Sequence, residues 1–210
     1  MATRNEQLGR ARNKTACRLR SLLCELVPGG IAGEISVSRA ERLLETVKAT
    51  NPVEATRVEV AAEHLDDLRR LDSQMRASKR RIRQAVMASG TTLTELFGVG
   101  PVVACMVVGH TGDVRRFPSR HHYASYTGTP PIEVSSGGRV VHRLSRRGNR
   151  QLNHAIHIAA ITQIRIRGSE GRLFFERKVA EGKTKKEAVR ALKRRISDAL
   201  YRQLLVDAAR

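Results

Sequence analysis

Residues 53–87, VEATRVEVAAEHLDDLRRLDSQMRASKRRIRQAVM, form the stretch that decides the fold of this chain. The stretch has no glycine or proline, and its apolar residues recur in alternating steps of three and four, the period of a coiled-coil seam. The seam consists of Val58, Ala61, Leu65, Leu68, Met75, Ile82 and Val86, with Asp72 and Lys79 as polar interruptions. The pattern predicts a helix about 50 Å long. Such a helix serves equally as one member of a bundle or as a spacer whose seam joins two copies of the chain.

Two shorter helices are predicted before the long one. Between residues 11 and 27, leucines share one helical face, and Pro28 with the two following glycines ends the helix. A second helix is expected after Ser38, and the residues around Pro52 separate it from the long helix. We therefore divide the chain into a helical connecting segment (1–52), a long coiled-coil helix (53–89) and a further helical domain (90–210).

The residues after the long helix predict a helix-hairpin-helix near 93–110. In LTELFGVGPVVACMVV, an apolar helix end is followed by Gly98-Val99-Gly100 and by a second apolar helix that begins at Pro101. Glycines allow a turn to approach a phosphate closely, and the free amides at the next helix start point at the anion. The alternative is a helical hairpin that binds nothing.

Residues 130–149, PPIEVSSGGRVVHRLSRRGN, show no helical period and predict a loop or a short β-ribbon. Ser135 and Ser136 stand before two glycines in this segment. The arginines that follow are Arg139, Arg143, Arg146, Arg147 and Arg150. A serine hydroxyl beside arginines could attack a phosphate, since the arginines stabilise the developing charge. A polar turn explains the same residues more simply, and the residues alone favour it.

Helices are predicted again for the rest of the chain. One begins at Asn149 and is apolar enough to be buried. The last one starts at a capping box formed by Thr184 and Glu187. Its core stripe consists of Val189, Leu192, Ile196, Leu200 and Leu204, and its basic face of Lys185, Lys186, Arg190, Lys193, Arg194 and Arg202. The basic face is either solvated or in contact with phosphates, and the fold class is mainly α.

The charge of the chain points to a polyanionic partner. It has 39 Lys and Arg against 20 Asp and Glu, a net charge of +19, and only 3% aromatic residues without tryptophan. A membrane-surface protein would carry an aromatic apolar helix face, and base-stacking folds need aromatic platforms. DNA bound through its backbone is therefore the favoured partner. Three cysteines at irregular spacing and no signal peptide predict a cytoplasmic, nucleoid-associated bacterial protein.

Catalysis by this chain alone is not predicted from its acidic residues or histidines. The acids cluster in the long helix among arginines, as expected of ion pairs on a helix surface. His121, His122, His154 and His157 have no cysteine or acid at a spacing that completes a metal site. We therefore expect no metal and no cofactor in this chain.

Several ordered motifs resemble a known family. LFGVGPVVA, FPSRHHYASYTGTPP, SSGG and LSRRGNRQLNHAIHIAA resemble the C-terminal domain of insertion-sequence transposases of the IS-one-ten, IS-one-sixteen and IS-nine-hundred-two group, the Piv-like recombinases. RNKTACRLRSLLCELVPGG and the long helix resemble the connecting segment of that family. The resemblance thus covers nearly the whole chain.

The resemblance implies a function and a missing part. It implies that Ser136 is a recombination nucleophile that becomes joined to DNA, and that a structured bridge RNA guides site choice. It further implies an N-terminal RuvC-like domain with Asp-Glu-Asp-Asp ligands for Mg²⁺, which we expect this chain to lack. We therefore predict the DNA-binding C-terminal portion of a transposase, inactive without the RuvC-like domain. The alternative is a helix-hairpin-helix DNA-binding protein without catalysis.

Overall fold

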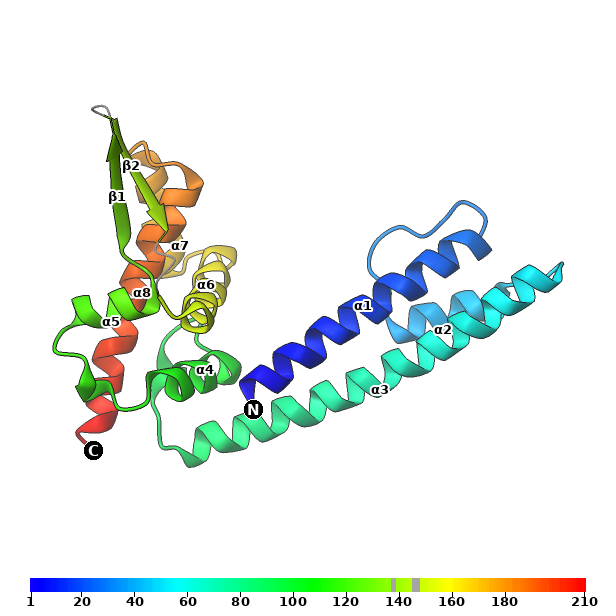
Figure 1. Ribbon diagram of the computed structural model, residues 1–210, viewed down its shortest axis with the longest axis horizontal. Coiled ribbons are helices and arrows are strands. Elements are labelled where there is room, and N and C mark those ends of the chain that lie inside the picture. Colours follow the sequence, from blue (N-terminus) through cyan, green and yellow to red (C-terminus); the bar gives the residue numbers. More distant parts are fainter. Residues whose placement is uncertain (137–138, 145–147) are drawn as a thin grey trace. The chain divides into compact units, whose positions relative to one another are not determined.

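The computed structural model describes residues 1–136, 139–144 and 148–210, and they divide into two compact units, Met1–Arg81 and Ile82–Arg210. Helices dominate both units, as the mainly α prediction states, and two short strands lie in the second (Figure 1). None of the described helices is both long and apolar enough to cross a membrane. Whether residues 1–52, 53–89 and 90–210 are independent domains stays a prediction.

The first unit is an antiparallel helical hairpin with a short helix packed on it. It contains α1 (Ala2–Leu26), α2 (Val37–Thr46) and most of α3 (Pro52–Ala88), which confirms the long helix. Arg12 of α1 pairs with Asp72 of α3 at 2.5 Å, and Glu25 pairs with Arg57 at 3.1 Å. The later residue of α1 thus pairs with the earlier residue of α3, so the two helices are antiparallel (Figure 1).

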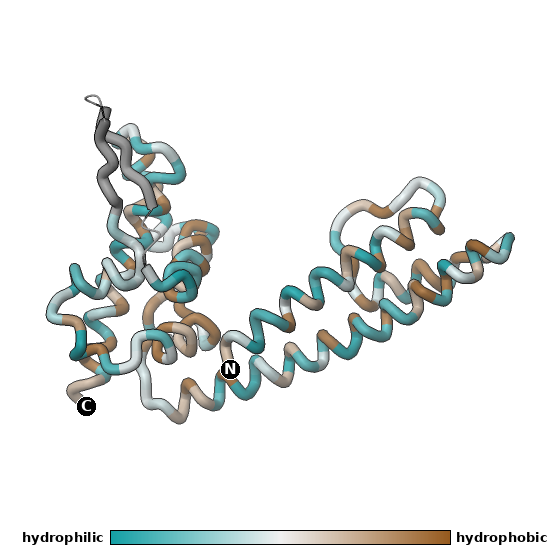
Figure 2. Tube along the Cα trace, in the orientation of Figure 1, coloured by the Kyte–Doolittle hydropathy of each residue, from teal (hydrophilic) through white to brown (hydrophobic). Residues whose placement is uncertain are grey.

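The predicted seam of α3 is packed within the chain over its first half. Its residues belong to one core cluster that consists of Leu19, Leu23, Ile31, Ile35, Ala40, Ala61, Leu65 and Leu68. Figure 2 shows the corresponding alternation of polar and apolar residues along α1 and α3. Asp72, expected as a polar interruption, is the partner of Arg12. In this structure the seam from residue 61 to 72 is therefore covered by α1 and α2.

Two helix starts in the first unit differ from the sequence prediction. α1 begins at Ala2 rather than near residue 11, because the polar residues before 11 are also compatible with a helix. α2 is capped by Ser36, whose hydroxyl accepts from the Arg39 amide at 3.3 Å, and not by Ser38. Both serines are good capping residues, so only the extended backbone at Ser36 decides between them.

The second unit is built around its last helix, α8 (Lys185–Ala208). Helices α5 (Arg120–Thr127), α6 (Arg150–Arg165) and α7 (Glu170–Ala180) pack against α8, and α4 (Pro101–Thr111) packs on α6. The capping box at Thr184 and Glu187 is present. The buried face of α8 consists of Ala188, Leu192, Lys193, Ile196, Ser197, Leu200, Tyr201 and Leu204. Four of the five predicted core residues are therefore buried and Val189 is half-buried, whereas Lys193, which the pattern places on the basic outer face, is buried.

One 3₁₀ turn replaces the first helix of the predicted helix-hairpin-helix. After α3 ends at Ala88, only η1 (Leu93–Glu95) precedes the glycine hairpin, and α4 begins at Pro101 as expected. The carboxylate of Asp207 in α8 accepts hydrogen bonds from Thr91 and Thr92. These bonds hold the connection to η1 in a turn, so an α-helix does not form there.

Candidate nucleic-acid interface

Ser136 ends the first strand of a two-stranded antiparallel ribbon. β1 (Pro131–Ser136) pairs with β2 (Arg139–Leu144), and the register sets Ser136 opposite Arg139. Because a strand rises about 3.3 Å per residue, Ser136 lies roughly 17 Å along the ribbon from Pro131. Arg143 lies in β2, whereas Arg146 and Arg147 lie outside the described residues, as do the side chains of the ribbon.

The two ends of the ribbon meet at a junction of glycines. Gly128 caps α5 in the left-handed conformation, with φ of 65°, and a methyl group added at Gly148 would collide with the Gly128 backbone. The Asn149 amide donates to the Tyr126 carbonyl at 2.7 Å, and the Thr129 amide donates to the Ala124 carbonyl at 3.1 Å. The entry and the exit of the ribbon are thus fixed against α5.

Asn149 serves this junction as a capping residue. Its side chain accepts from the amides of Gln151 and Leu152 at the start of α6, both at 3.0 Å. Its amide group also donates to the Tyr126 hydroxyl at 3.4 Å, a bond that lowers the pKa of Tyr126. We also predict from the sequence that Asn149 binds nucleic acid, and that role stays a prediction beside this structural one. Arg150 follows as the exposed first residue of α6.

A buried polar network lies behind the junction. The amide of Asn153 donates to the carbonyls of Thr127 at 3.0 Å and Gly128 at 2.9 Å, and its oxygen accepts from the Lys193 ammonium at 2.5 Å. Lys193 is only 6% exposed, and this burial lowers its pKa to about 8. No local sequence pattern predicts this contact, because Asn153 and Lys193 are 40 residues apart.

Buried hydroxyls extend the same network to α8. The Thr127 hydroxyl lies 3.1 Å from the hydroxyls of both Thr129 and Ser197. Buried polar groups that find their partners favour one arrangement of the backbone over others. The network therefore fixes the base of the ribbon, between Thr127 and Pro131, to the helical core of the second unit.

The two predicted hairpin glycines have different surroundings. Gly98 has φ of +84°, and a Cβ there would lie 2.9 Å from the Ala159 carbonyl of α6. Gly100 caps α4 with φ of −78°, and a Cβ there would meet no atom within 4 Å. No side chain caps α4, so its first amides have no side-chain partner at Gly100. Gly98 is thus required for packing against α6, whereas Gly100 has free space around it.

The structure does not bring all predicted site residues together. Gly98 lies against Ala159 near the end of α6, and Asn149 lies at its start. Ten residues of helix separate these contacts, which is about 15 Å. The ribbon and the glycine hairpin are therefore two separate regions of the second unit, joined by α6.

Neighbouring groups occupy part of the basic face of α8. Arg194 pairs with Asp198 at 3.2 Å and contacts His121, and Arg202 donates to the Asp198 carbonyl at 3.4 Å. Lys185 and Lys186 are exposed at the start of the helix. Among the residues that the structure describes, no three His, Cys, Asp or Glu converge to hold a metal ion.

Comparison with known proteins finds a transposase family that matches part of the second unit. Residues 90–176 match the family described as "Transposase IS116/IS110/IS902 family". The match includes the glycine hairpin, the ribbon, α6 and the start of α7.

Two relatives also match this chain. The chain is 31% identical over 147 residues to the "Probable family 20 transposase" of Pseudomonas aeruginosa, covering 64% of this chain and 43% of that protein. It is 34% identical over 113 residues to the "Insertion element IS110 uncharacterized 43.6 kDa protein" of Streptomyces coelicolor, covering 53% of this chain and 28% of that protein. The matched regions span less than half the length of these relatives.

Proposed function

We propose that this chain is the DNA-binding part of a transposase and that Ser136 is its nucleophile. The observation that carries the proposal is the place of Ser136 as the last residue of β1, opposite Arg139, in a ribbon whose base is fixed by buried hydrogen bonds. A fixed base lets the ribbon present its far end to a DNA strand in one orientation. The family match supports a role in transposition.

The proposed reaction is a phosphoryl transfer. The Ser136 hydroxyl oxygen attacks a DNA phosphorus and forms a phosphoserine ester, while the bond from phosphorus to one sugar oxygen breaks. That oxygen leaves as a hydroxyl and takes up a proton equivalent to the one that the serine loses. Arg139 would stabilise the charge on the phosphate, but arginine is too basic to accept the serine proton. A base must therefore come from elsewhere.

The missing base defines the partner that we propose. A RuvC-like region with carboxylates and Mg²⁺ would supply it, and a structured bridge RNA would direct the complex to its site. DNA would also be held by the open amides at Gly100 and by exposed cations such as Arg150. With a net charge of +19, binding should weaken steeply with salt, because each phosphate that is neutralised releases counterions.

The test is capture of a covalent protein–DNA adduct. The full chain is mixed with a RuvC-like partner domain, Mg²⁺, DNA and guide RNA, and the adduct is detected on a denaturing gel. Ser136→Ala should abolish the adduct and leave DNA affinity unchanged, because it removes one oxygen and no charge. Ser135→Ala is the matched control and should retain the adduct.

Two outcomes would decide against the proposal. An adduct that persists with Ser136→Ala would show that another residue is the nucleophile. Salt-sensitive DNA binding by the wild-type chain with no adduct under any condition would favour the alternative, a helix-hairpin-helix DNA-binding protein without catalysis.

A further inference from the structure

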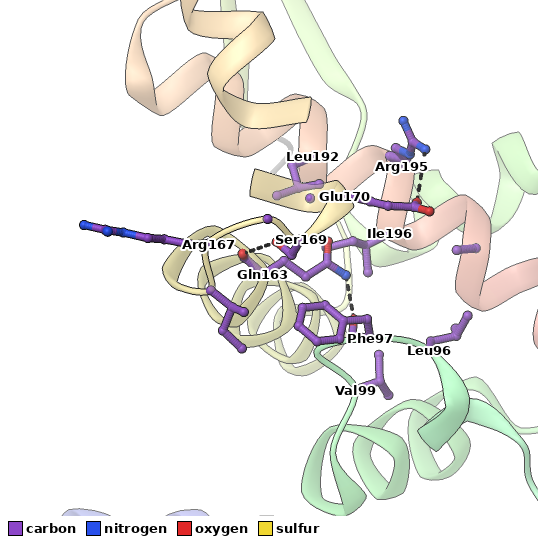
Figure 3. Close-up of a pocket in the computed structure, with 14 residues that line it drawn as sticks. Leu96, Phe97, Val99, Gln163, Arg167, Ser169, Glu170, Leu192, Arg195 and Ile196 are labelled. Atoms are coloured by element: carbon purple, nitrogen blue, oxygen red, sulfur yellow. Dashed lines mark hydrogen bonds and ion pairs between the residues drawn. The ribbon is translucent and has the colours of Figure 1, made fainter. Parts of the chain in front are cut away.

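A cavity of about 510 Å³ lies between the segment after η1, the turn from α6 to α7, and α8 (Figure 3). Leu96 and Val99 form one side of it, and Leu192 and Ile196 form the opposite side. Phe97 and Gln163 lie between these sides. The cavity is therefore a mainly apolar space of the size that small ligands occupy in proteins.

Phe97 lines this cavity and is largely exposed. Its exposed fraction is 52%, and it is the one aromatic side chain among the large apolar residues exposed in the described part of the chain. Phe117 and Tyr123, by contrast, pack edge to face at 5.2 Å. An exposed ring in a concave, apolar wall offers a flat surface on which a second flat group can stack.

The backbone that carries Phe97 is held rigidly. The Gln163 amide donates to the Phe97 carbonyl at 2.6 Å, and Gly98 packs directly on the Ala159 carbonyl. Ser169 in turn donates to the Gln163 carbonyl at 2.6 Å. Preorganised aromatic groups lose little entropy when a partner stacks on them. The backbone that positions the ring at the cavity is thus fixed.

The charges around the cavity favour an anionic occupant. Arg167 and Arg195 are exposed lining residues, and Glu170 is the one acidic residue of the lining. Glu170 lies 3.7 Å from Arg195 and its side chain is 93% exposed, so this ion pair is weak and does not close the cavity. An occupant with an apolar flat part and a negative part matches the ring and the two arginines together.

We infer that the cavity receives one unpaired base of a nucleic-acid strand, stacked on Phe97 with its phosphate near the arginines. The inference rests on the proposed function and names the ligand of a second contact on the same unit. Stacking of a single base is compatible with the low aromatic content of the chain, because it needs one ring and not a platform of several rings. Gln163 and Ser169 already bond to the protein, so stacking should accept any base without hydrogen-bond readout.

The test compares three DNA duplexes that differ at one position. One has a single bulged nucleotide, one has an abasic bulge, and one is fully paired; affinities are measured by fluorescence anisotropy at fixed salt. The wild-type chain should prefer the base-containing bulge to the abasic bulge by about tenfold, the size expected of one stacked base. Phe97→Leu, which keeps an apolar side chain, should remove the preference.

A matched control and a direct reporter complete the experiment. Leu173→Ala alters an apolar side chain that is 58% exposed on α7 outside the cavity, and it should keep the preference. Because the chain has no tryptophan, Phe97→Trp introduces a single indole ring at the cavity. Its tryptophan emission should be quenched by the base-containing bulge and not by the abasic one.

Each other result overturns the inference. Equal affinity of the wild-type chain for the two bulges, or an unchanged preference in Phe97→Leu, would rule out stacking at Phe97. If salt-sensitive binding to the paired duplex persists in that case, the proposed function stands and only the cavity assignment fails. Loss of self-association in Phe97→Leu without any change in bulge preference would assign the cavity to a second copy of the chain.

Discussion

Replacing Asn153 with leucine should destabilise the second unit strongly. Leucine has a similarly branched side chain but removes the two bonds to the carbonyls of Thr127 and Gly128 and the bond from Lys193. A neutral hydrogen bond contributes about 1 kcal/mol net and one to a charged group about 2 kcal/mol, so the loss is about 4 kcal/mol. For a unit of this size, this corresponds to a fall in Tm of roughly 15 °C.

The assay is urea and thermal unfolding followed by circular dichroism, with a double variant as the control. Asn153→Leu leaves the Lys193 ammonium buried without its partner, which accounts for part of the cost. Adding Lys193→Met removes that charge, so the double variant should be more stable than Asn153→Leu alone. A single variant within about 1 kcal/mol of the wild type would refute the importance of this network.

Three further predictions follow from the same structure. Burial lowers the pKa of Lys193 to about 8, below its ordinary value of 10.5, so the unfolded state binds more protons between these values. Stability should therefore rise with pH from 8 to 10, and Lys193→Met should remove this rise in unfolding experiments. Gly98→Ala should lower Tm, because it strains a positive φ against α6, whereas Gly100→Ala should keep Tm close to that of the wild type and weaken DNA binding. Gly109→Ala is the control, because a methyl group at this position of α4 meets no other atom; it should neither lower Tm nor change DNA affinity. Leu68→Asp should unfold the first unit as judged by limited proteolysis, because Leu68 is fully buried inside the chain; a folded unit that merely changes from dimer to monomer in sedimentation would show that the seam joins subunits.

The helices were predictable because their signals are local. The heptad pattern of α3 and the capping box of α8 each lie within one stretch of sequence, and both are confirmed. Local signals cannot show which helix covers a seam, so the sequence left open whether Leu65 and Leu68 face the same chain or a second copy. α1 and α2 cover them here.

The site was predictable only where a motif carried it. The ribbon and the start of α6 at Asn149 follow from the residues themselves. Lys193 was assigned to the outer face because lysine is usually exposed, and only its tertiary partner Asn153 explains its burial. The place of Phe97 in a cavity is likewise not predictable from the sequence, because the exposure of a side chain depends on neighbours far along the chain. The nucleophilic role of Ser136 stays a prediction.

The glycine junction makes the ribbon an insertion that the helical unit can tolerate in many forms. The backbones of Gly128 and Gly148 are in direct contact. The end of α5 and the start of α6 are therefore held together independently of the residues between these two glycines. The entropy of closing such a segment changes only with the logarithm of its length. Segments of other lengths and sequences could therefore be grafted between these two glycines, or the whole excursion excised, without altering how α5 and α6 meet. Diversification of the ribbon would then be separable from maintenance of the helical scaffold.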